Sequence, residues 1–213
     1  PDSLLEKVRK NMKDTRSRLQ ENDRKSAEKT QGRTDESLEE LVENLMSQME
    51  RIEEENEAED ADFLRILLKS TVRVSVSQEN LMESLGKTYL NDPRYAVQIR
   101  KQSALNMEIR FLADSINAIS RRQPQVALST NQEVRNMLSY SQETLDLLLA
   151  MNNIHYQHYN TANSRALARQ QYTMTSLNNL ALLLSESLDR MQQKMNMKGK
   201  SGSSKKKQRG QPQ

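Results

Sequence analysis

The sequence predicts an all-α protein: an elongated antiparallel helical bundle or a set of short coiled coils, followed by a disordered basic tail. Two observations predict this class. Only 35% of the 213 residues are apolar, with five Gly and four Pro, which is little material for one thick core and few turn residues for a β or α/β fold. The apolar residues also recur at alternating spacings of three and four, a repeat that aligns one face of a helix.

Charge distinguishes the first two segments. Residues 1–34 carry ten basic and six acidic side chains, and residues 35–62 carry thirteen acidic side chains against one basic side chain. We expect a charged N-terminal helix over 3–30, closed by Gly32, and then a helix over 36–88 that begins with the acidic segment. The acidic segment lacks the Gly and Glu positions of a calcium-binding loop, so its carboxylates are interpreted as a solvated helix face.

An apolar stripe crosses the acidic segment. Its spacings alternate between four and three, and it comprises Leu38, Val42, Leu45, Met49 and Ile52. Further along the same predicted helix, residues 71–77 alternate β-branched and polar side chains as a strand would. The sequence offers no partner strand, and no Gly or Pro interrupts this stretch, so a helix is favoured there.

Residues 63–197 are expected to form the core of the bundle. This region contains three further predicted helices, over 93–121, 130–156 and 162–196. Asp92 can cap the first of them while Pro93 takes the first helical position, where its missing N–H costs nothing. Thr130 and Glu133 have capping-box spacing, which places the start of the second helix there or one turn earlier. The asparagine-rich stretch 152–163 is expected to form a break or a kink in the helix before the last predicted helix.

Two of these helices carry the candidate interaction residues. They are Leu105, Ile109, Leu112 and Ile116 on one helix and Leu177, Leu180 and Leu184 on another. Their spacing predicts either core residues or a partner-binding face. Substitution by Ala would cost about 2–5 kcal/mol at each position if these residues are core, whereas smaller losses accompanied by lost oligomerisation would indicate an interface.

Reactive side chains are scarce. The sequence contains no Cys and two His, which excludes disulfides, thiolate zinc sites and a Cys nucleophile. His155 and His158 share a helix face, but two imidazoles without a third ligand do not complete a zinc site. No glycine-rich phosphate loop or nucleophile elbow is present. We therefore expect a protein that is not an enzyme, with no catalytic residues, no cofactor and no metal site.

Residues 198–213 are predicted to be a disordered tail rich in Lys, Ser and Gly. Its basic cluster consists of Lys205, Lys206, Lys207 and Arg209. Such residues release counterions from phosphates, but no aromatic side chain is interleaved to stack on bases, which argues against a nucleic-acid partner. An anionic membrane surface would attract the tail equally well.

The sequence contains no apolar run that approaches the ~20 residues needed to span a bilayer. It begins at Pro1, without an initiator Met. We therefore expect an excerpt or a processed fragment, with any membrane anchor outside it.

Several motifs follow one another between residues 63 and 195 in a familiar order. They are DPRY at 92–95, LADSI at 112–116, SRRQPQ at 120–125, QYTMTSLNNLALLL at 171–184 and MQQKM at 191–195. In this order the chain resembles the helical C-terminal half of a domain-of-unknown-function family of large membrane-anchored Bacteroidota proteins. Members of that family have transmembrane helices near the N terminus and a Gln/Met-rich coiled-coil region after them.

The resemblance implies a protein of the bacterial cell envelope, exposed to the periplasm and tethered to the inner membrane by a segment outside this sequence. The family has no established activity, so no catalytic residue is carried over. We therefore expect a non-enzymatic helical scaffold or protein-interaction module, which binds a protein partner or itself through helical faces. The alternative is a protein that binds nucleic acid or an anionic membrane surface through its basic tail.

Overall fold

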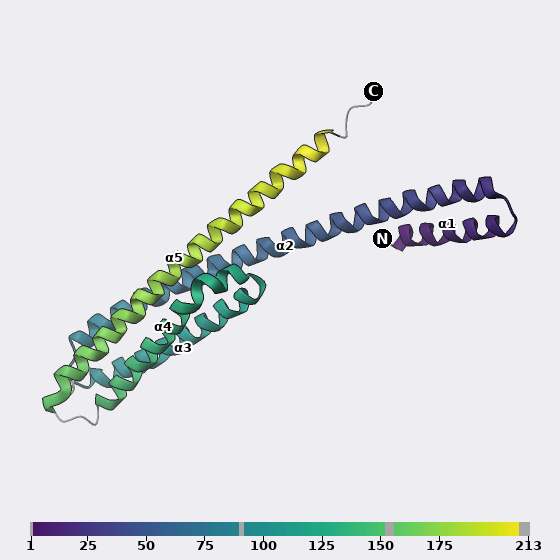
Figure 1. Cartoon of the computed structure of the whole chain (residues 1–213). Helices are drawn as coiled ribbons and strands as arrows, with labels where there is room; N and C mark the ends of the chain where they lie inside the picture. The colour runs from purple at the N-terminus through teal and green to yellow at the C-terminus, as the bar shows by residue number, and fades with distance from the viewer. Residues whose placement is uncertain (1, 90–91, 152–155, 209–213) are drawn as a thin grey trace. The chain divides into compact units, whose positions relative to one another are not determined.

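The computed structural model describes residues 2–89, 92–151 and 156–208, apart from the side chains of residues 2, 156–160 and 199–208. Every regular element in these ranges is an α-helix (Figure 1). The helices are α1 (Asp2–Gln20), α2 (Arg24–Gly86), α3 (Arg94–Arg122), α4 (Pro124–Met151) and α5 (Tyr156–Gln208). The predicted all-α class is confirmed, and residues 71–77 are helical within α2 as predicted.

The first turn lies ten residues earlier than predicted. The chain reverses at residues 21–23, where Asn22 has a positive φ of 58°, a conformation that Asn tolerates better than most residues. Asp23 then caps α2, because its Oδ1 accepts the backbone N–H of Ser26 at 3.2 Å. Gly32 was expected to end a helix, but it lies inside α2. An isolated Gly is tolerated in a helix at a modest energetic cost.

Residues 1–58 form one of two compact units. In this unit α1 and the first part of α2 pack as an antiparallel hairpin, in which Lys7 pairs with Glu40 at 3.4 Å and the Asn11 amide donates to Ser37 Oγ at 3.3 Å. The buried residues of the hairpin are few and mostly small: Val8, Ala27, Thr30, Thr34, Ser37 and Leu41. The hairpin interface is therefore thin.

Residues 59–213 form the second unit, and its described part is an antiparallel four-helix bundle made of the second part of α2 with α3, α4 and α5. Arg73 pairs with Glu108, and Gln78 bonds to Gln102, so residue numbers rise along α2 as they fall along α3. α3 with α4, and α4 with α5, run antiparallel in the same way. Two apolar clusters fill the bundle: a large one with members from all four helices, and a smaller one that includes Leu85, Tyr95 and Leu148.

A layer of hydrogen-bonded amides crosses this apolar core. The side chain of Gln102 in α3 exchanges hydrogen bonds with Gln78 of α2, accepts one from Gln170 of α5 and donates one to Asn106. Asn106 in turn donates to the backbone carbonyl of Ser141 in α4 at 2.8 Å. All four helices meet in this layer. Because a shift of any helix would leave buried amides unpaired, the layer fixes their relative register.

The predicted cap of α3 is confirmed. Asp92 Oδ1 accepts the backbone N–H of Arg94 at 2.8 Å. Pro93 between them already has helical dihedral angles, with φ −53° and ψ −25°. Its fixed φ and missing N–H suit this first position of a helix.

The turn between α3 and α4 is shorter than predicted. α4 starts at Pro124, two turns before the capping-box position, and only Gln123 separates it from α3. The Gln123 side chain donates to Asp60 Oδ2 at 2.8 Å, and Arg122 pairs with the other oxygen of Asp60 at 2.8 Å. The hydroxyl of Thr130 bonds to the carbonyl of Val126 inside the helix instead of capping it. The turn is thus held by a carboxylate far away in sequence.

α5 is longer than predicted at both ends. It starts at Tyr156 rather than at 162, and its backbone continues to Gln208 rather than ending near 196. The predicted break or kink falls partly on residues 152–155, which lie outside the described residues. Among the helices that the structure describes, none combines the length and the hydropathy that a bilayer crossing requires.

Candidate functional site

The seven candidate interaction residues are all buried in the core of the bundle. Their exposed fractions range from 0% to 5%, and all seven belong to the apolar cluster that joins the four helices. They are Leu105, Ile109, Leu112, Ile116, Leu177, Leu180 and Leu184. Two roles were predicted for these residues, core packing and partner binding, and in the structure they pack in the core. A partner of the folded bundle must therefore use other residues.

A second set of heptad-spaced residues is exposed. The α2 stripe, as we call Leu38, Val42, Leu45, Met49 and Ile52, has exposed fractions between 41% and 64%. Met46 lies beside the stripe and is 62% exposed. The sequence revealed the spacing of these residues but not their exposure. They are the surface residues of this chain that most resemble a helix-packing seam.

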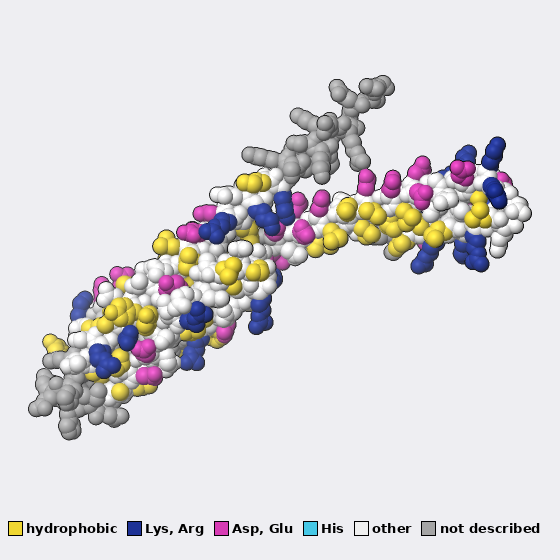
Figure 2. Space-filling view, viewed as in Figure 1, with side chains coloured by type: hydrophobic (Ala, Val, Ile, Leu, Met, Phe, Trp, Pro, Cys, Tyr) yellow, Lys and Arg dark blue, Asp and Glu magenta, His cyan; other side chains and the backbone are white. Residues whose placement is uncertain are grey.

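The stripe is exposed because the hairpin uses a different face of α2. The hairpin contact buries residues on the neighbouring face, from Ala27 to Leu41, and α1 begins at Asp2, close to the level of Leu41. In the described residues of this unit, no position from 42 to 56 is buried. Figure 2 shows hydrophobic side chains in a row along this part of α2, bordered by acidic side chains.

α1 also presents a set of exposed apolar side chains. Leu5, Met12 and Leu19 follow one another at seven-residue intervals and are 42–58% exposed. They lie beside the hairpin face of α1, which contains Val8, Asn11 and Thr15. The first unit therefore exposes apolar residues on both of its helices, although its interior buries few.

The α2 stripe lies in an acidic segment that follows a basic one. Residues 24–33, before the stripe, hold four basic side chains and one acidic side chain, whereas residues 50–58, at its end, hold five acidic side chains and one basic side chain. The stripe itself lies among acidic side chains, since residues 35–43 at its start hold five acidic side chains and no basic one.

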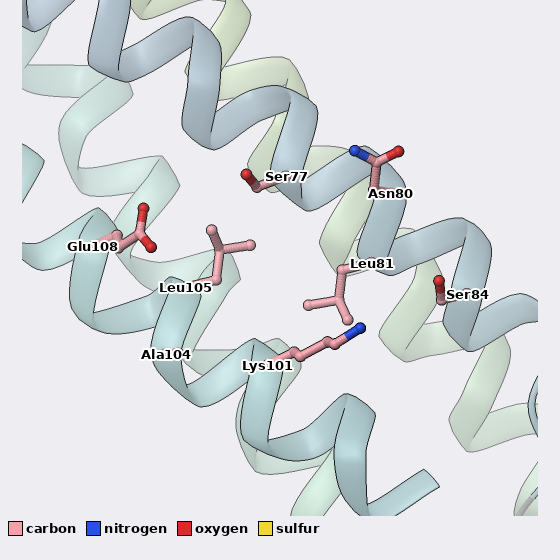
Figure 3. Close-up of a pocket in the computed structure, with 8 residues that line it drawn as sticks. All are labelled: Ser77, Asn80, Leu81, Ser84, Lys101, Ala104, Leu105 and Glu108. Atoms are coloured by element: carbon pink, nitrogen blue, oxygen red, sulfur yellow. The ribbon is translucent and has the colours of Figure 1, made fainter. Parts of the chain in front are cut away.

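Among the described residues of the bundle, a shallow groove lies between α2 and α3, with a volume of about 320 Å³. Figure 3 shows its lining residues: Ser77, Asn80, Leu81, Ser84, Lys101, Ala104, Leu105 and Glu108. Its two charged groups, Lys101 and Glu108, are seven residues apart on α3, which separates their Cα atoms by about 10 Å. Glu108 is also paired with Arg73 at 3.2 Å. The groove therefore does not converge an acid and a base on one point.

A cation–π cluster joins α4 and α5 at the surface of the bundle. The Arg169 guanidinium lies 5.6 Å from the ring centre of Tyr140 and 5.8 Å from that of Tyr172. Arg169 also pairs with Glu143 at 2.8 Å. The charge of Arg169 is thus paired within the chain, and the cluster links the two helices at the surface.

Asp23 and Asp92, which are both helix caps, have lowered pKa values. The side-chain and backbone hydrogen bonds of Arg94 hold the pKa of Asp92 below its ordinary value. Hydrogen bonds from Ser26 lower the pKa of Asp23 in the same way. Both effects are structural, since a carboxylate that accepts hydrogen bonds at a helix start favours its charged form. Within the described residues, no group of three or more His, Cys, Asp or Glu side chains is placed to hold a metal ion.

The remaining predicted sites lie outside the residues and side chains that the structure describes. His155 lies outside the described residues, and so does the side chain of His158. The side chains of Lys205, Lys206 and Lys207 are likewise not described, nor is Arg209.

No protein-family model matches this chain, and no curated protein or solved structure is significantly similar to it.

Proposed function

We propose that this chain is a non-enzymatic helical scaffold, a protein-interaction module. In this proposal the four-helix bundle is the rigid support, and the hairpin of residues 1–58 carries the contact surface. The amide layer around Gln102 and the buried leucines supply the rigidity. The α2 stripe supplies the apolar face that a helical partner would cover.

A single observation carries the proposal. From residue 42 to residue 56 no side chain is buried, yet five apolar residues keep heptad spacing through and just before this segment. An isolated helix of this length is marginal in water, because helices in proteins draw their stability from packing of an apolar face. Contiguous exposed apolar patches on soluble domains mark interaction sites.

Photo-cross-linking in the native host tests the proposal. A photoreactive amino acid at Met49 should give a discrete covalent adduct with a protein, which can be another copy of this chain. The matched control is the same amino acid at Leu128, which is 79% exposed on α4 and lies outside the stripe. Absence of an adduct at Met49, or the same set of adducts from both positions, would contradict an interaction role for the stripe.

We also propose that the module is tethered to the inner membrane of a bacterial envelope and faces the periplasm. This location rests on the resemblance of residues 63–195 to membrane-anchored Bacteroidota proteins. Reading the open reading frame upstream of Pro1 tests it: hydrophobic spans there would support the tether. Loss of salt-sensitive binding to RNA or anionic vesicles on deletion of residues 198–213 would instead favour the alternative function of the basic tail.

A further inference from the structure

We infer that the α2 stripe binds a basic amphipathic helix of another protein. The apolar face of that helix covers the stripe, and Lys or Arg side chains along one edge of this face lie beside glutamates of α2. The inference rests on the proposed function and names the chemistry of the partner. It is carried by the exposure of the stripe, by the side of the stripe on which the glutamates lie, and by the scarcity of basic residues around them.

Glutamates follow the stripe residues along α2. The Glu row, as we call it, consists of the residues that come directly after Leu38, Val42, Met49 and Ile52: Glu39, Glu43, Glu50 and Glu53. Because consecutive residues of a helix are about 100° apart around its axis, the four glutamates lie on the same side of the stripe. All four are exposed. Acidic side chains accordingly line one side of the hydrophobic row in Figure 2.

α1 lies on the opposite side of the stripe. Ser37, which accepts a hydrogen bond from Asn11 of α1, and the buried Leu41 come directly before stripe residues rather than directly after them. The rotation of about 100° per residue places them, and therefore α1, away from the Glu row. The Glu row thus borders the edge of the stripe that α1 leaves open.

Charge selects a basic partner. Residues 35–58 hold ten acidic side chains and Arg51 as their single basic side chain, a net charge of −9. Arg51 comes directly before Ile52, so it lies on the side of the stripe opposite the Glu row. Charges beside an apolar seam set partner choice in helix pairs, since opposite charges attract and like charges exclude wrong partners. The same repulsion opposes a second copy of this acidic segment and an anionic membrane surface.

The stripe also sets the length of the partner helix. From Leu38 to Ile52 it extends about 21 Å along the axis of α2, which is about four turns. A partner segment of about 15 residues that repeats apolar side chains at spacings of three and four covers this length. In such a complex the apolar anchors supply affinity and the charged edge supplies specificity.

Two synthetic peptides test the inference with the full chain. Each peptide has three heptads with Leu at the a and d positions; one carries Lys at the e and g positions, and the other carries Glu. Fluorescence anisotropy should show binding of the Lys peptide. The Glu peptide should bind at least about 30-fold more weakly, because its carboxylates meet the Glu row. The affinity for the Lys peptide should fall as the salt concentration rises.

Variants of the chain locate the charged contact. A variant without the Glu row should bind the Lys peptide at least about tenfold more weakly. It contains Glu39→Gln, Glu43→Gln, Glu50→Gln and Glu53→Gln. The control removes as many carboxylates from exposed positions of the bundle, with Glu79→Gln, Asp114→Asn, Glu186→Gln and Asp189→Asn. This control should bind like the wild type, because its Glu row is intact.

A second pair of variants tests the apolar contact. Leu45→Gln/Met49→Gln should weaken binding of the Lys peptide by at least about tenfold, since it removes two apolar anchors. The control Leu128→Gln/Leu182→Gln changes positions that are 79% and 65% exposed in the bundle and should bind like the wild type. Circular dichroism should show all four variants to be as helical as the wild type, because every substituted side chain is exposed.

Equal binding of the two peptides, no binding of the Lys peptide at about 100 μM, or a variant without the Glu row that binds as tightly as its control overturns the inference. Light scattering adds a further test. A mass of twice 24.6 kDa that Leu45→Gln/Met49→Gln returns to 24.6 kDa would mean that a second copy occupies the stripe. Binding to anionic vesicles that this double variant abolishes would assign the stripe to a membrane instead.

These outcomes are separable from failure of the proposed function. If Met49 cross-links to a protein in cells while the Lys peptide binds no better than the Glu peptide, the interaction module stands and the basic partner falls. If Met49 gives no adduct and neither peptide binds, both fall.

Discussion

The α2 stripe and the buried stripe of α3 have the same spacing and similar side chains, but opposite exposure. Leu38, Val42 and Met49 are 41–64% exposed in the first unit, whereas Ile109 and Ile116 in the bundle are no more than 1% exposed. Both stripes predict a helix with one apolar face. The difference teaches that heptad spacing determines which face of a helix is apolar, while other segments of the structure determine whether that face is covered.

The two units also differ in the hydrogen-bond partners of their buried polar side chains. The bundle buries amides such as Gln78, Gln102 and Gln170 in a hydrogen-bonded layer, while the hairpin buries Thr30, Thr34 and Ser37 with their hydroxyls bonded to their own helix or to Asn11. Amides that bond between helices specify one register. Hydroxyls that bond to carbonyls three or four residues earlier stay within their own helix. They leave only small side chains at the interface and do little to fix the register between two helices. Polar bonds between helices therefore fix the register of the bundle, whereas the hairpin has a thin interface with few such bonds.

The largest expected effect contrasts the two stripes directly. Ile109→Ala should lower the free energy of unfolding by about 2–5 kcal/mol, because it opens a cavity in a close-packed core. Leu45→Ala should change it by less than about 0.5 kcal/mol in the purified chain, where no partner protein covers the α2 stripe. Urea denaturation of both variants measures this. Equal losses at the two positions would show that something other than solvent contacts the α2 stripe.

The next effect concerns the amide layer. Gln102→Ala should cost about 2–3 kcal/mol, since it removes the shared partner of Gln78, Asn106 and Gln170 and leaves buried groups unsatisfied. Gln132 bonds to Asn136 on the exposed surface of α4, so Gln132→Ala is the control and should stay within about 0.5 kcal/mol of the wild type. Thermal denaturation followed by circular dichroism compares them. A Gln102 variant as stable as the control would mean that the layer does not tie the four helices.

A smaller effect, of opposite sign, is expected in the hairpin. Gly32 lies inside α2 with ordinary helical φ, and a Cβ built there meets no atom within 4 Å. Gly32→Ala should therefore stabilise this part of α2 by about 0.5–1 kcal/mol, because Ala loses less backbone entropy on forming a helix. Hydrogen exchange of the amides in residues 24–40 reports the change. Faster exchange in the variant would place Gly32 in a conformation that requires glycine.

The smallest expected effect is on pH dependence, and it compares one cap from each unit. The pKa of Asp23 in the hairpin and that of Asp92 in the bundle are both lowered by hydrogen bonds. Because the folded pKa lies below the unfolded one, the stabilisation is fully present above the unfolded Asp pKa and is lost as pH falls through the folded pKa. NMR titration of the two carboxyls should give values below that of an unstructured Asp.

The variant Asp92→Asn provides the control for this titration. Asn caps a helix about as well as Asp, so α3 should keep its start while the acid-dependent loss at this position disappears. An Asp92 carboxyl that titrates like an unstructured Asp would show that its bonds to Arg94 do not persist in solution.

Much of this fold follows from local sequence. The helical class and the cap of Asp92 with Pro93 could be predicted, because each depends on neighbours within a few residues. The continuity of α2 through residues 71–77 could also be predicted, but from the absence of a partner strand and against the local alternation. The turn at Asn22 also had a local signal, an Asn followed by Asp23 and Ser26 at capping distance. The prediction that placed the end of the helix at Gly32 missed this signal, because a helix accommodates an isolated Gly at a small energetic cost.

Other features were decided only by the tertiary structure. Gln123 could serve as the whole turn between α3 and α4 because Asp60, more than sixty residues earlier, binds both Gln123 and Arg122. The burial of Ile109 and the exposure of Leu45 likewise depend on which helices lie alongside. Spacing along one helix is a local property of the chain, whereas coverage of its apolar face depends on distant segments or on a second molecule. The sequence alone therefore determined which helix faces are apolar, and only the tertiary structure decided which of these faces is left exposed.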